Sequence, residues 1–215
     1  MGTTLCMVAH PDDELIGMGG TLFKYAKEGE RIIVVIFSYG ELSDPLMQKN
    51  ILQQTRVGEA RNVGKRMGVN EILFLGLQDG KMRKSMKDET VLKKIEAIFK
   101  KYQPQKIFTH AAGDAHLSGD HIAVYHMVLK VFDRIHYPGD FYTFDVWSPL
   151  RVFKRGSPRL YIDITKTFEK KIKALELYDS QKVSVYTLLP GLHLKARVYG
   201  DEIQCKYAEM FYKLR

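Results

Sequence analysis

The chain has 215 residues, a length typical of one domain. Apolar residues make up 45% and charged residues 27%, which excludes disorder as the main state, and the longest unbroken apolar run, residues 32–37, is far shorter than the roughly 20 residues of a membrane-spanning helix. The net charge of +8 is compatible with an anionic partner, but acidic residues interleave with Lys over 93–106 and 166–173, which favours a solvated helix surface over a nucleic-acid site.

The two cysteines and the N-terminal segment bear on the location of the protein. Cys6 and Cys205 lie near opposite ends of the sequence, and Cys6 falls in a predicted buried strand, so we expect no disulfide framework and a cytoplasmic location. The apolar stretch after Met1 is short and ends at His10, so we expect no secretory signal and no membrane association.

Strands and helices are predicted to alternate along the first two thirds of the chain. Short apolar runs predict the strands, and apolar residues at helical spacing predict the helices. Gly29 and Gly68 are suited to end two of these helices, and Asp88 is suited to cap a third. In chain order we expect a strand over 3–9, a helix over 15–28, a strand over 31–37, a helix over 45–67, a strand over 71–75, a helix from Asp88 to about residue 102, a strand over 106–109 and a helix over 121–136.

After Pro138 the pattern is less regular. We expect strands over 141–147 and 160–164, helices over 167–178 and 202–214, and irregular structure over 179–200. No repeat, low-complexity tract or linker divides the sequence, so residues 1–215 are predicted to form a single domain. Four successive strand–helix units predict an α/β fold with a mostly parallel sheet and helices on both faces.

Polar residues gather at the predicted carboxyl ends of the strands, where open α/β sheets bind their ligands. The string His10-Pro11-Asp12-Asp13-Glu14 follows the first strand, residues 38–41 follow the second, residues 76–80 follow the third, and residues 110–121 follow the fourth. Two of these loops contain four of the seven histidines, each with acidic neighbours. The sequence therefore predicts a functional site at this edge of the sheet.

The residue types in these loops suit metal-assisted hydrolysis. A catalytic zinc site uses three His, Asp or Glu ligands and leaves one position to water. His10 and Asp13 can converge on one ion if their loop turns into the following helix, and His121 can supply the third ligand. Asp12 would then be free to take a proton from the bound water.

Each of these residues also has a purely structural interpretation. Asp12, Asp13 or Glu14 could cap or charge the first helical turn, and Asp120 could cap the helix that starts at His121. The other histidines, at positions 126, 136 and 193, are predicted to be structural or exposed. A structural interpretation of all these residues at once is less convincing than one of any single residue, because two His/Asp clusters fall at adjacent strand ends.

Two rival sites fail on spacing. Gly17-Met18-Gly19-Gly20 is similar to a dinucleotide-binding turn, but Leu22 stands where the next glycine is needed and the run begins well after the strand ends. The sequence has no G-x-S-x-G motif, which argues against an α/β-type serine hydrolase.

The run from Ala9 to Glu14 resembles the hallmark of the LmbE-like and PIG-L zinc-dependent N-deacetylases, the family of the N-acetylglucosaminyl deacetylases. The likeness covers most of the chain and is strongest over the first 125 residues. It continues at Asp120-His121, at Arg56-x-x-Glu59-Ala60 with Gly68, Phe74-Leu75-Gly76 and Asp79-Gly80, and at Asp163-Ile164-Thr165 with Ser180-Gln181.

The resemblance implies a Rossmann-like fold and hydrolysis of the acetamide of an N-acetylglucosamine-type sugar. It assigns His10, Asp13 and His121 as zinc ligands and Asp12 as the general base. Contacts to the sugar fall on Arg56, Glu41 and Asp79. Each of these three has an alternative: Arg56 could pair with Glu59, Glu41 could lie in a solvated loop, and Asp79 could form a turn with Gly80.

One position departs from the family pattern. Many members have a second histidine three residues before the ligand histidine, and Ser118 stands there in this chain. The nearest histidine is His116, five residues before His121, so the residue that fills this second role stays open. We count His116 and Asp120, beside Asp12, as candidate catalytic residues.

The sequence thus predicts a hydrolase that holds one Zn²⁺, or another divalent ion, and removes an acetyl group by attack of a zinc-bound water that Asp12 activates. The expected partner is a small N-acetylated amino sugar or its conjugate, with no nucleic acid, and the resemblance implies a homo-oligomer such as a trimer or hexamer. The alternative function is a non-catalytic Rossmann-like module that binds a nucleotide or an anion. The absence of a glycine-rich phosphate loop argues against that module.

Overall fold

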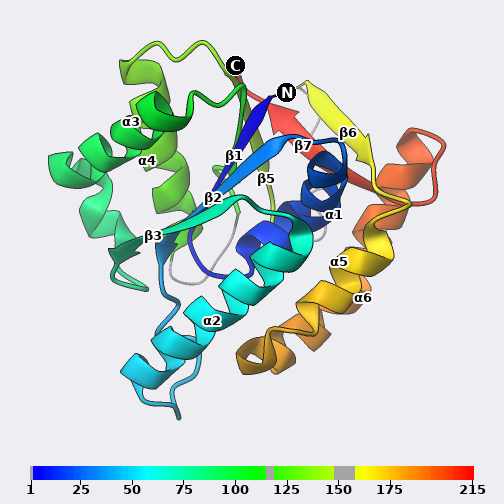
Figure 1. Ribbon diagram of the computed structural model, residues 1–215, viewed down its shortest axis with the longest axis horizontal. Helices are drawn as coiled ribbons and strands as arrows, with labels where there is room; N and C mark the ends of the chain where they lie inside the picture. The colour runs from blue at the N-terminus through cyan, green and yellow to red at the C-terminus, as the bar shows by residue number, and fades with distance from the viewer. Residues whose placement is uncertain (1, 115–118, 148–157) are drawn as a thin grey trace.

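The computed structural model describes residues 2–114, 119–147 and 158–215, which form one seven-stranded sheet (Figure 1). The strand order is β3-β2-β1-β4-β5-β7-β6; the first five strands are parallel, and β7 runs antiparallel to both of its neighbours. The predicted α/β fold with a mostly parallel sheet is confirmed. The strands are β1 (Thr3–Val8), β2 (Arg31–Ser38), β3 (Glu71–Leu77), β4 (Lys106–His110), β5 (Asp140–Phe144), β6 (Arg159–Asp163) and β7 (Ala208–Lys213).

Helices cover both faces of the sheet, as predicted. In Figure 1, α3 and α4 lie on one side of the strands, and α1, α2, α5 and α6 lie on the other. No helix in the described part of the chain is both long enough and apolar enough to cross a membrane. The helices are α1 (Asp13–Lys27), α2 (Lys49–Met67), α3 (Glu89–Tyr102), α4 (Asp120–Arg134), α5 (Phe168–Leu175) and α6 (Lys182–Glu202), with 3-10 turns η1 (Met82–Lys87) and η3 (Asp179–Gln181).

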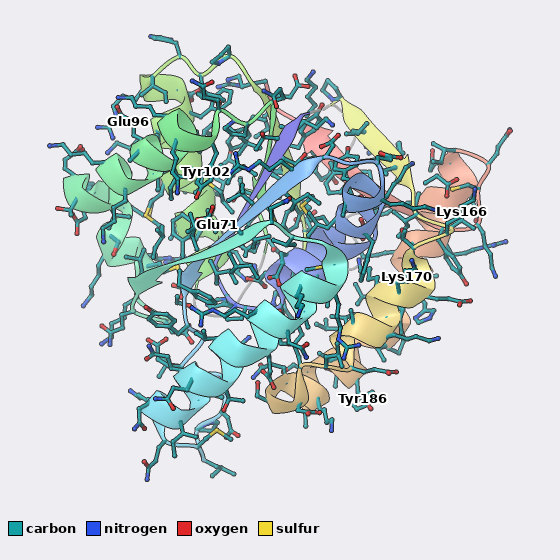
Figure 2. The ribbon with its side chains drawn as sticks, viewed as in Figure 1. Glu71, Glu96, Tyr102, Lys166, Lys170 and Tyr186 are labelled. Carbon is teal, nitrogen blue, oxygen red and sulfur yellow. The ribbon has the colours of Figure 1, made fainter. Side chains whose placement is uncertain are left out.

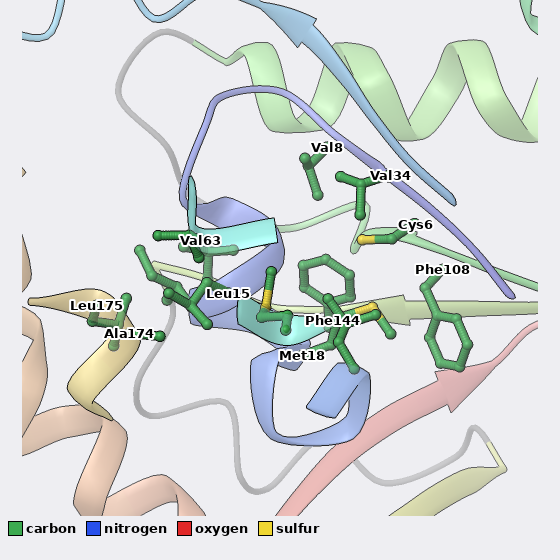
Figure 3. Packing of buried hydrophobic residues seen from close by; sticks show 14 of the residues in the cluster. Cys6, Val8, Leu15, Met18, Val34, Val63, Phe108, Phe144, Ala174 and Leu175 are labelled. Carbon is green, nitrogen blue, oxygen red and sulfur yellow. The ribbon is translucent and has the colours of Figure 1, made fainter. Parts of the chain in front are cut away.

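The core has two halves because successive side chains of a strand point to opposite faces. In β1, Cys6 and Val8 face the half under α1 and α2, whereas Leu5 and Met7 face the half under α3 and α4. Figure 3 shows the first half, where Leu15 and Met18 of α1 pack near Phe144. Burying a side chain of this size stabilises the fold by about 1.5–3 kcal/mol, so the central strands are fixed in place.

Two predictions for the C-terminal part are wrong. Residues 179–200, expected to be irregular, form η3 and most of α6, and the expected helix over 202–214 is instead the end of α6 followed by β7. The sequence pattern did not indicate α6 because Pro190 and Gly191 lie in its interior. Val185, Leu192 and Ala196 nevertheless have helical spacing and are buried. The apolar residues of the last segment also have helical spacing, but its pairing with β5 and β6 prevails over that local pattern.

Charged side chains on the outer surface agree with the predicted solvated helix faces. Lys166 and Lys170, at the start of α5, extend to solvent (Figure 2). On α3, Glu96 lies 2.6 Å from Lys100 in an exposed ion pair.

Helix α1 is interrupted at Met18, whose backbone is not helical, and a buried ion pair binds the freed backbone groups. Lys171 donates to the carbonyl of Ile16 and to Glu209, both at 2.7 Å, and Glu209 accepts the N–H groups of Gly20 and Thr21. A Cβ at Gly17 would lie 2.2 Å from the ring of Phe144, so the glycine run allows close packing and does not form a phosphate loop.

Candidate metal centre and active site

The predicted site residues meet at the carboxyl ends of the central parallel strands. The loop after β1 supplies His10 and Asp12, and the first residue of α1 is Asp13. Asp79 follows β3, and His121 lies in the first turn of α4. All five residues are at most 8% exposed, so a polar cluster is buried at the point where the sequence analysis expected a ligand site.

Imidazole nitrogens surround one carboxylate oxygen of this cluster. Asp13 Oδ2 lies 3.4 Å from His10 Nδ1, 3.3 Å from His121 Nε2 and 3.5 Å from His110 Nε2. These distances exceed the 2.7–3.2 Å of ordinary N–H···O hydrogen bonds. Ligand atoms of His10, Asp13 and His121 all lie within 4.8 Å of one another.

The outer ring nitrogens of His10 and His121 face further carboxylates. His10 Nε2 lies 3.0 Å from Asp79 Oδ1 and 3.4 Å from Asp120 Oδ2, and His121 Nδ1 lies 2.7 Å from Asp114 Oδ2. Metal-binding histidines in proteins are held in this way by a carboxylate on the second ring nitrogen. Two imidazoles, one carboxylate and their outer partners therefore fit a divalent ion of the zinc type.

The charges of the cluster are strongly coupled. Burial lowers the pKa of His10, but the carboxylates of Asp120, Asp13 and Asp79 more than offset it, so that this pKa is raised. Burial alone would raise the pKa of Asp13, but His121, His10 and His110 hold this pKa well below its usual range. The carboxylate of Asp13 is thus kept ionised, as a metal ligand must be.

Asp12, between His10 and Asp13, has an unusual backbone conformation. Its φ of 103° lies in the left-handed region, which costs free energy for a residue with a side chain. The Glu14 carboxylate accepts the Asp12 N–H at 3.1 Å, and Arg56 Nη2 donates to Asp12 Oδ2 at 3.1 Å. Burial raises the pKa of Asp12 to about 7, against the opposing effect of Arg56.

Arg56 reaches the site from the middle of α2. It is 2% exposed, and it donates to the backbone carbonyls of Pro11 and Gly40 as well as to Asp12. The alternative pairing with Glu59 is not found, because Glu59 accepts hydrogen bonds from the backbone and hydroxyl of Ser180. Arg56 Nε lines this region without a hydrogen-bond partner in residues 2–114, 119–147 and 158–215.

Glu41, Asp79 and Asp120 join the loops around the site. Glu41 Oε1 accepts the Asp79 N–H at 3.0 Å, and Asp79 Oδ2 accepts the Leu42 N–H at 3.0 Å. Asp120 accepts from the N–H groups of Gly80 and Met82. Glu41 is therefore not simply solvated, and Asp79 both forms the turn with Gly80 and contacts His10.

Sequence reasoning missed His110 and Asp114 as members of the site. Both are fully buried, and the ring of His110 stacks on His121 at 3.8 Å between centroids. Their only sequence signal is their position in the polar loop after β4. His116 and Ser118 lie outside the described residues, and the histidines at positions 126, 136 and 193 are exposed, as predicted.

A cavity of about 360 Å³ opens above the cluster, within the range typical of small-molecule sites. Its floor is polar and includes Asp12, Asp13 and Arg56. Its other wall is largely apolar and is formed by the loop after β2 and the first turns of α6. A hydrogen bond of 2.9 Å from Gln181 Nε2 to Ser43 Oγ connects the loop to the residue before α6. The apolar lining residues are Ile16, Leu42, Trp147, Val185 and Leu188.

A sequence-family model described as "PIG-L: GlcNAc-PI de-N-acetylase" matches residues 5–132. The chain is 25% identical over 179 residues to a 1D-myo-inositol 2-acetamido-2-deoxy-alpha-D-glucopyranoside deacetylase of Thermomonospora curvata, covering 70% of this chain but less than two thirds, 59%, of that relative. It is also 26% identical over 200 residues to a 4-oxalmesaconate hydratase of Pseudomonas putida, covering 84% of this chain and 74% of the relative.

A solved structure supports the fold independently. The N,N'-diacetylchitobiose deacetylase from Pyrococcus horikoshii superposes with a TM-score of 0.84 over 99% of this chain and 84% of that one, at 24% identity. At that identity the likeness concerns the fold alone. The comparisons thus bring together one architecture and two kinds of reaction.

Proposed function

This chain belongs to the PIG-L family, and we propose that it is a metal-dependent hydrolase that removes the acetyl group from an N-acetylglucosamine-type amino sugar. The observation that carries the proposal is the convergence of His10, Asp13 and His121 beneath a cavity that also contains Asp12. We propose these three as the ligands of one zinc ion, and Asp12 as the general base.

The family membership and the donor set together favour metal-assisted chemistry. A divalent ion held by His10, Asp13 and His121 would polarise the amide carbonyl and make a water molecule more acidic. The chain's own residues then have to place the substrate and move the protons. The oxyanion that develops on the substrate carbonyl would need a donor, and His116 is our candidate for it.

Asp12 is suited to take the proton of the attacking water. Its carboxylate lines the cavity, and Arg56 and the strained backbone hold it in one orientation. As the water oxygen bonds to the carbonyl carbon, its proton passes to Asp12; when the carbon–nitrogen bond breaks, the leaving amine takes that proton. The products are a free amine and acetic acid, which releases its remaining proton to solvent as acetate, and Asp12 returns to its initial state.

Arg56, Glu41 and Asp79 are our candidates for contacts with the sugar. Arg56 Nε and Glu41 Oε2 are buried polar atoms with no hydrogen-bond partner in the described part of the chain, and a buried polar group without a partner is costly. A sugar hydroxyl could satisfy either of them. Asp79 and Asp120 already contact His10, so their contribution includes holding that ring in place.

The match to the hydratase gives a second candidate function, the addition of water to a carbon–carbon double bond of a small acid. That match covers a larger share of both chains than the match to the deacetylase of Thermomonospora curvata. The same Asp12 could take a proton from the attacking water. We favour deacetylation because the family model that matches residues 5–132 describes a de-N-acetylase.

The test is a pair of assays on one zinc-loaded preparation. We expect acetate release from N-acetylglucosamine glycosides, loss of that release on chelation, and its recovery when zinc is added back. A conjugated unsaturated dicarboxylate, followed by its ultraviolet absorbance, tests hydration. Hydration without acetate release would establish the second candidate, and bound metal without turnover of either kind of substrate would favour the non-catalytic binding module.

A further inference from the structure

We propose that Asp114 is a positioning residue that fixes the metal-binding form of His121 and couples this ring to the substrate-facing segment at Trp147, with His110 as its second imidazole partner. The proposal rests on the proposed function, because it presupposes a metal ion at His10, Asp13 and His121. It concerns two residues, Asp114 and His110, that neither the sequence motifs nor the proposed mechanism assigns.

Asp114 has polar contacts with three parts of the molecule: the end of β4, the start of α4 and the segment after β5. Its Oδ2 lies 2.7 Å from His121 Nδ1 and 3.3 Å from His110 Nδ1, and it also accepts the Val146 N–H at 3.0 Å. Its Oδ1 accepts the Trp147 N–H at 2.8 Å. One fully buried carboxylate thus joins the loop after β4, the start of α4 and the segment after β5.

The contacts define the proton positions on both rings. A carboxylate only accepts, so the 2.7 Å contact places the His121 proton on Nδ1 and directs the Nε2 lone pair toward Asp13, 3.3 Å away. His110 Nε2 accepts the backbone N–H of Ala9 at 3.0 Å, so neutral His110 also carries its proton on Nδ1, toward Asp114. Both imidazoles therefore turn Nδ1 toward the same carboxylate, His121 at a hydrogen-bond distance of 2.7 Å and His110 at a longer 3.3 Å.

The consequence for the metal site is orientation. The Nδ1–H···Oδ2 bond prevents rotation of the His121 ring, and the stacked His110 ring supports it from one side, with 20° between the ring planes. A carboxylate in this position also raises the basicity of the ligand nitrogen, and its loss in known metal sites costs on the order of 10–100-fold in metal affinity.

The same carboxylate extends the effect to the substrate cavity. Trp147 forms part of the apolar wall, and Asp114 holds its backbone. Removal of the Asp114 charge would therefore disturb the ligand ring and this wall together. If Asp114 were purely structural, its removal would lower stability without a specific effect on the His121 ring or on the wall at Trp147.

The molecule offers a matched control in Glu209, which is also buried, accepts two backbone N–H groups and pairs with a basic side chain. We expect Asp114→Asn to lower zinc affinity on the order of 10–100-fold in competition with a chromophoric chelator. It should also change the visible spectrum of the cobalt-substituted protein. Glu209→Gln should lower Tm while zinc affinity and the cobalt spectrum stay as in the unaltered protein.

A second measurement avoids the risk that Asp114→Asn does not fold. In the zinc-loaded unaltered protein, ¹⁵N NMR of the imidazoles should show the His121 proton on Nδ1 and the metal on Nε2. The opposite tautomer, or an Asp114→Asn variant that binds zinc as tightly as the unaltered protein with the same cobalt spectrum, would overturn the proposal. Failure of the unaltered protein to bind metal would instead contradict the proposed function.

Discussion

Two buried polar clusters contact the same helix, α1, one at its start and one at its interruption at Met18, and they differ in how their charges are paired. At the interruption of α1, Lys171 and Glu209 are 2.7 Å apart, and each also binds backbone groups of α1 at 2.7–3.0 Å. At the start of α1, three imidazole nitrogens stand 3.3–3.5 Å from Asp13 Oδ2. Among the described residues, the opposite charges of the first cluster pair at hydrogen-bond distance, whereas the nitrogens and the oxygen of the second have the spacing of ligands around a cation.

This difference separates a structural role from a functional one. A buried ion pair that also binds backbone groups holds elements in register, here the second half of α1 against α5 and β7. A cluster of ligand atoms that make few close contacts with one another needs a further group to be satisfied. The expected consequence is that changes in the first cluster affect stability, and changes in the second affect metal binding and turnover.

The largest expected effect is on turnover, in Asp12→Asn. Asn tolerates the left-handed backbone of this position, so the change removes the charge without removing the fold. We expect kcat to fall by roughly 10²–10⁴, the usual contribution of a general base, with Tm nearly unchanged. Single-turnover acetate release measures the effect; a variant that keeps full activity would show that another group takes the proton.

Lys171→Met should have the next largest effect, and on stability alone. The change leaves Glu209 as a buried carboxylate without its cation, which costs about 3–5 kcal/mol. For a domain of this size the expected fall in Tm is about 6–20 °C. The double variant Lys171→Met, Glu209→Gln should recover part of the loss, and zinc content should stay unchanged in both; a loss of zinc would mean that the two clusters are not separable.

Arg56→Ala tests a residue that has both a structural and a proposed functional role. Arg56 contacts Asp12 directly, and its Nε has no hydrogen-bond partner among the described residues and is our candidate donor to the substrate, so its loss removes charge-assisted hydrogen bonds of about 1.5–3 kcal/mol. We expect kcat/KM to fall by roughly 10–150-fold while zinc stays bound. Arg61→Ala, an exposed arginine on the same helix, is the control and should retain the full rate.

Tyr178→Phe should have the smallest effect. The Tyr178 hydroxyl donates to Glu14 Oε1 at 2.9 Å, and Glu14 Oε2 holds the backbone of Asp12. The loss of one such bond is expected to cost about 1 kcal/mol in unfolding free energy, measured by urea denaturation. A decrease in kcat much larger than the decrease in stability would show that Glu14 controls the position of Asp12 more strongly than we infer.

The local sequence was sufficient to predict a feature where all of its residues lie close together in the chain. His10 and Asp12 lie in the loop after a buried strand and Asp13 begins the following helix, so their proximity follows from the strand end. Asp88 caps α3 as expected and accepts the Thr90 N–H. β7 was not predictable in this way, because its pairing with β5 and β6 depends on residues far away in the sequence.

The same reason explains what was missed in the site. Asp114 owes its importance to Val146 and Trp147, more than thirty residues further along the chain. The buried environment of Arg56 depends on Gly40 and on the loop after β1, not on its helix neighbour Glu59. Contacts of this kind require the sheet order, which the sequence pattern does not specify.

The different roles of the adjacent residues Asp12 and Asp13 are the central claim, and metal analysis of matched variants tests it most directly. Purified unaltered protein, Asp12→Asn and Asp13→Asn should be saturated with zinc, dialysed and analysed by mass spectrometry for metal per chain. We expect about one zinc ion in the unaltered protein and in Asp12→Asn, and a large loss in Asp13→Asn that excess zinc partly reverses. Loss of zinc from Asp12→Asn with full retention in Asp13→Asn would contradict this account.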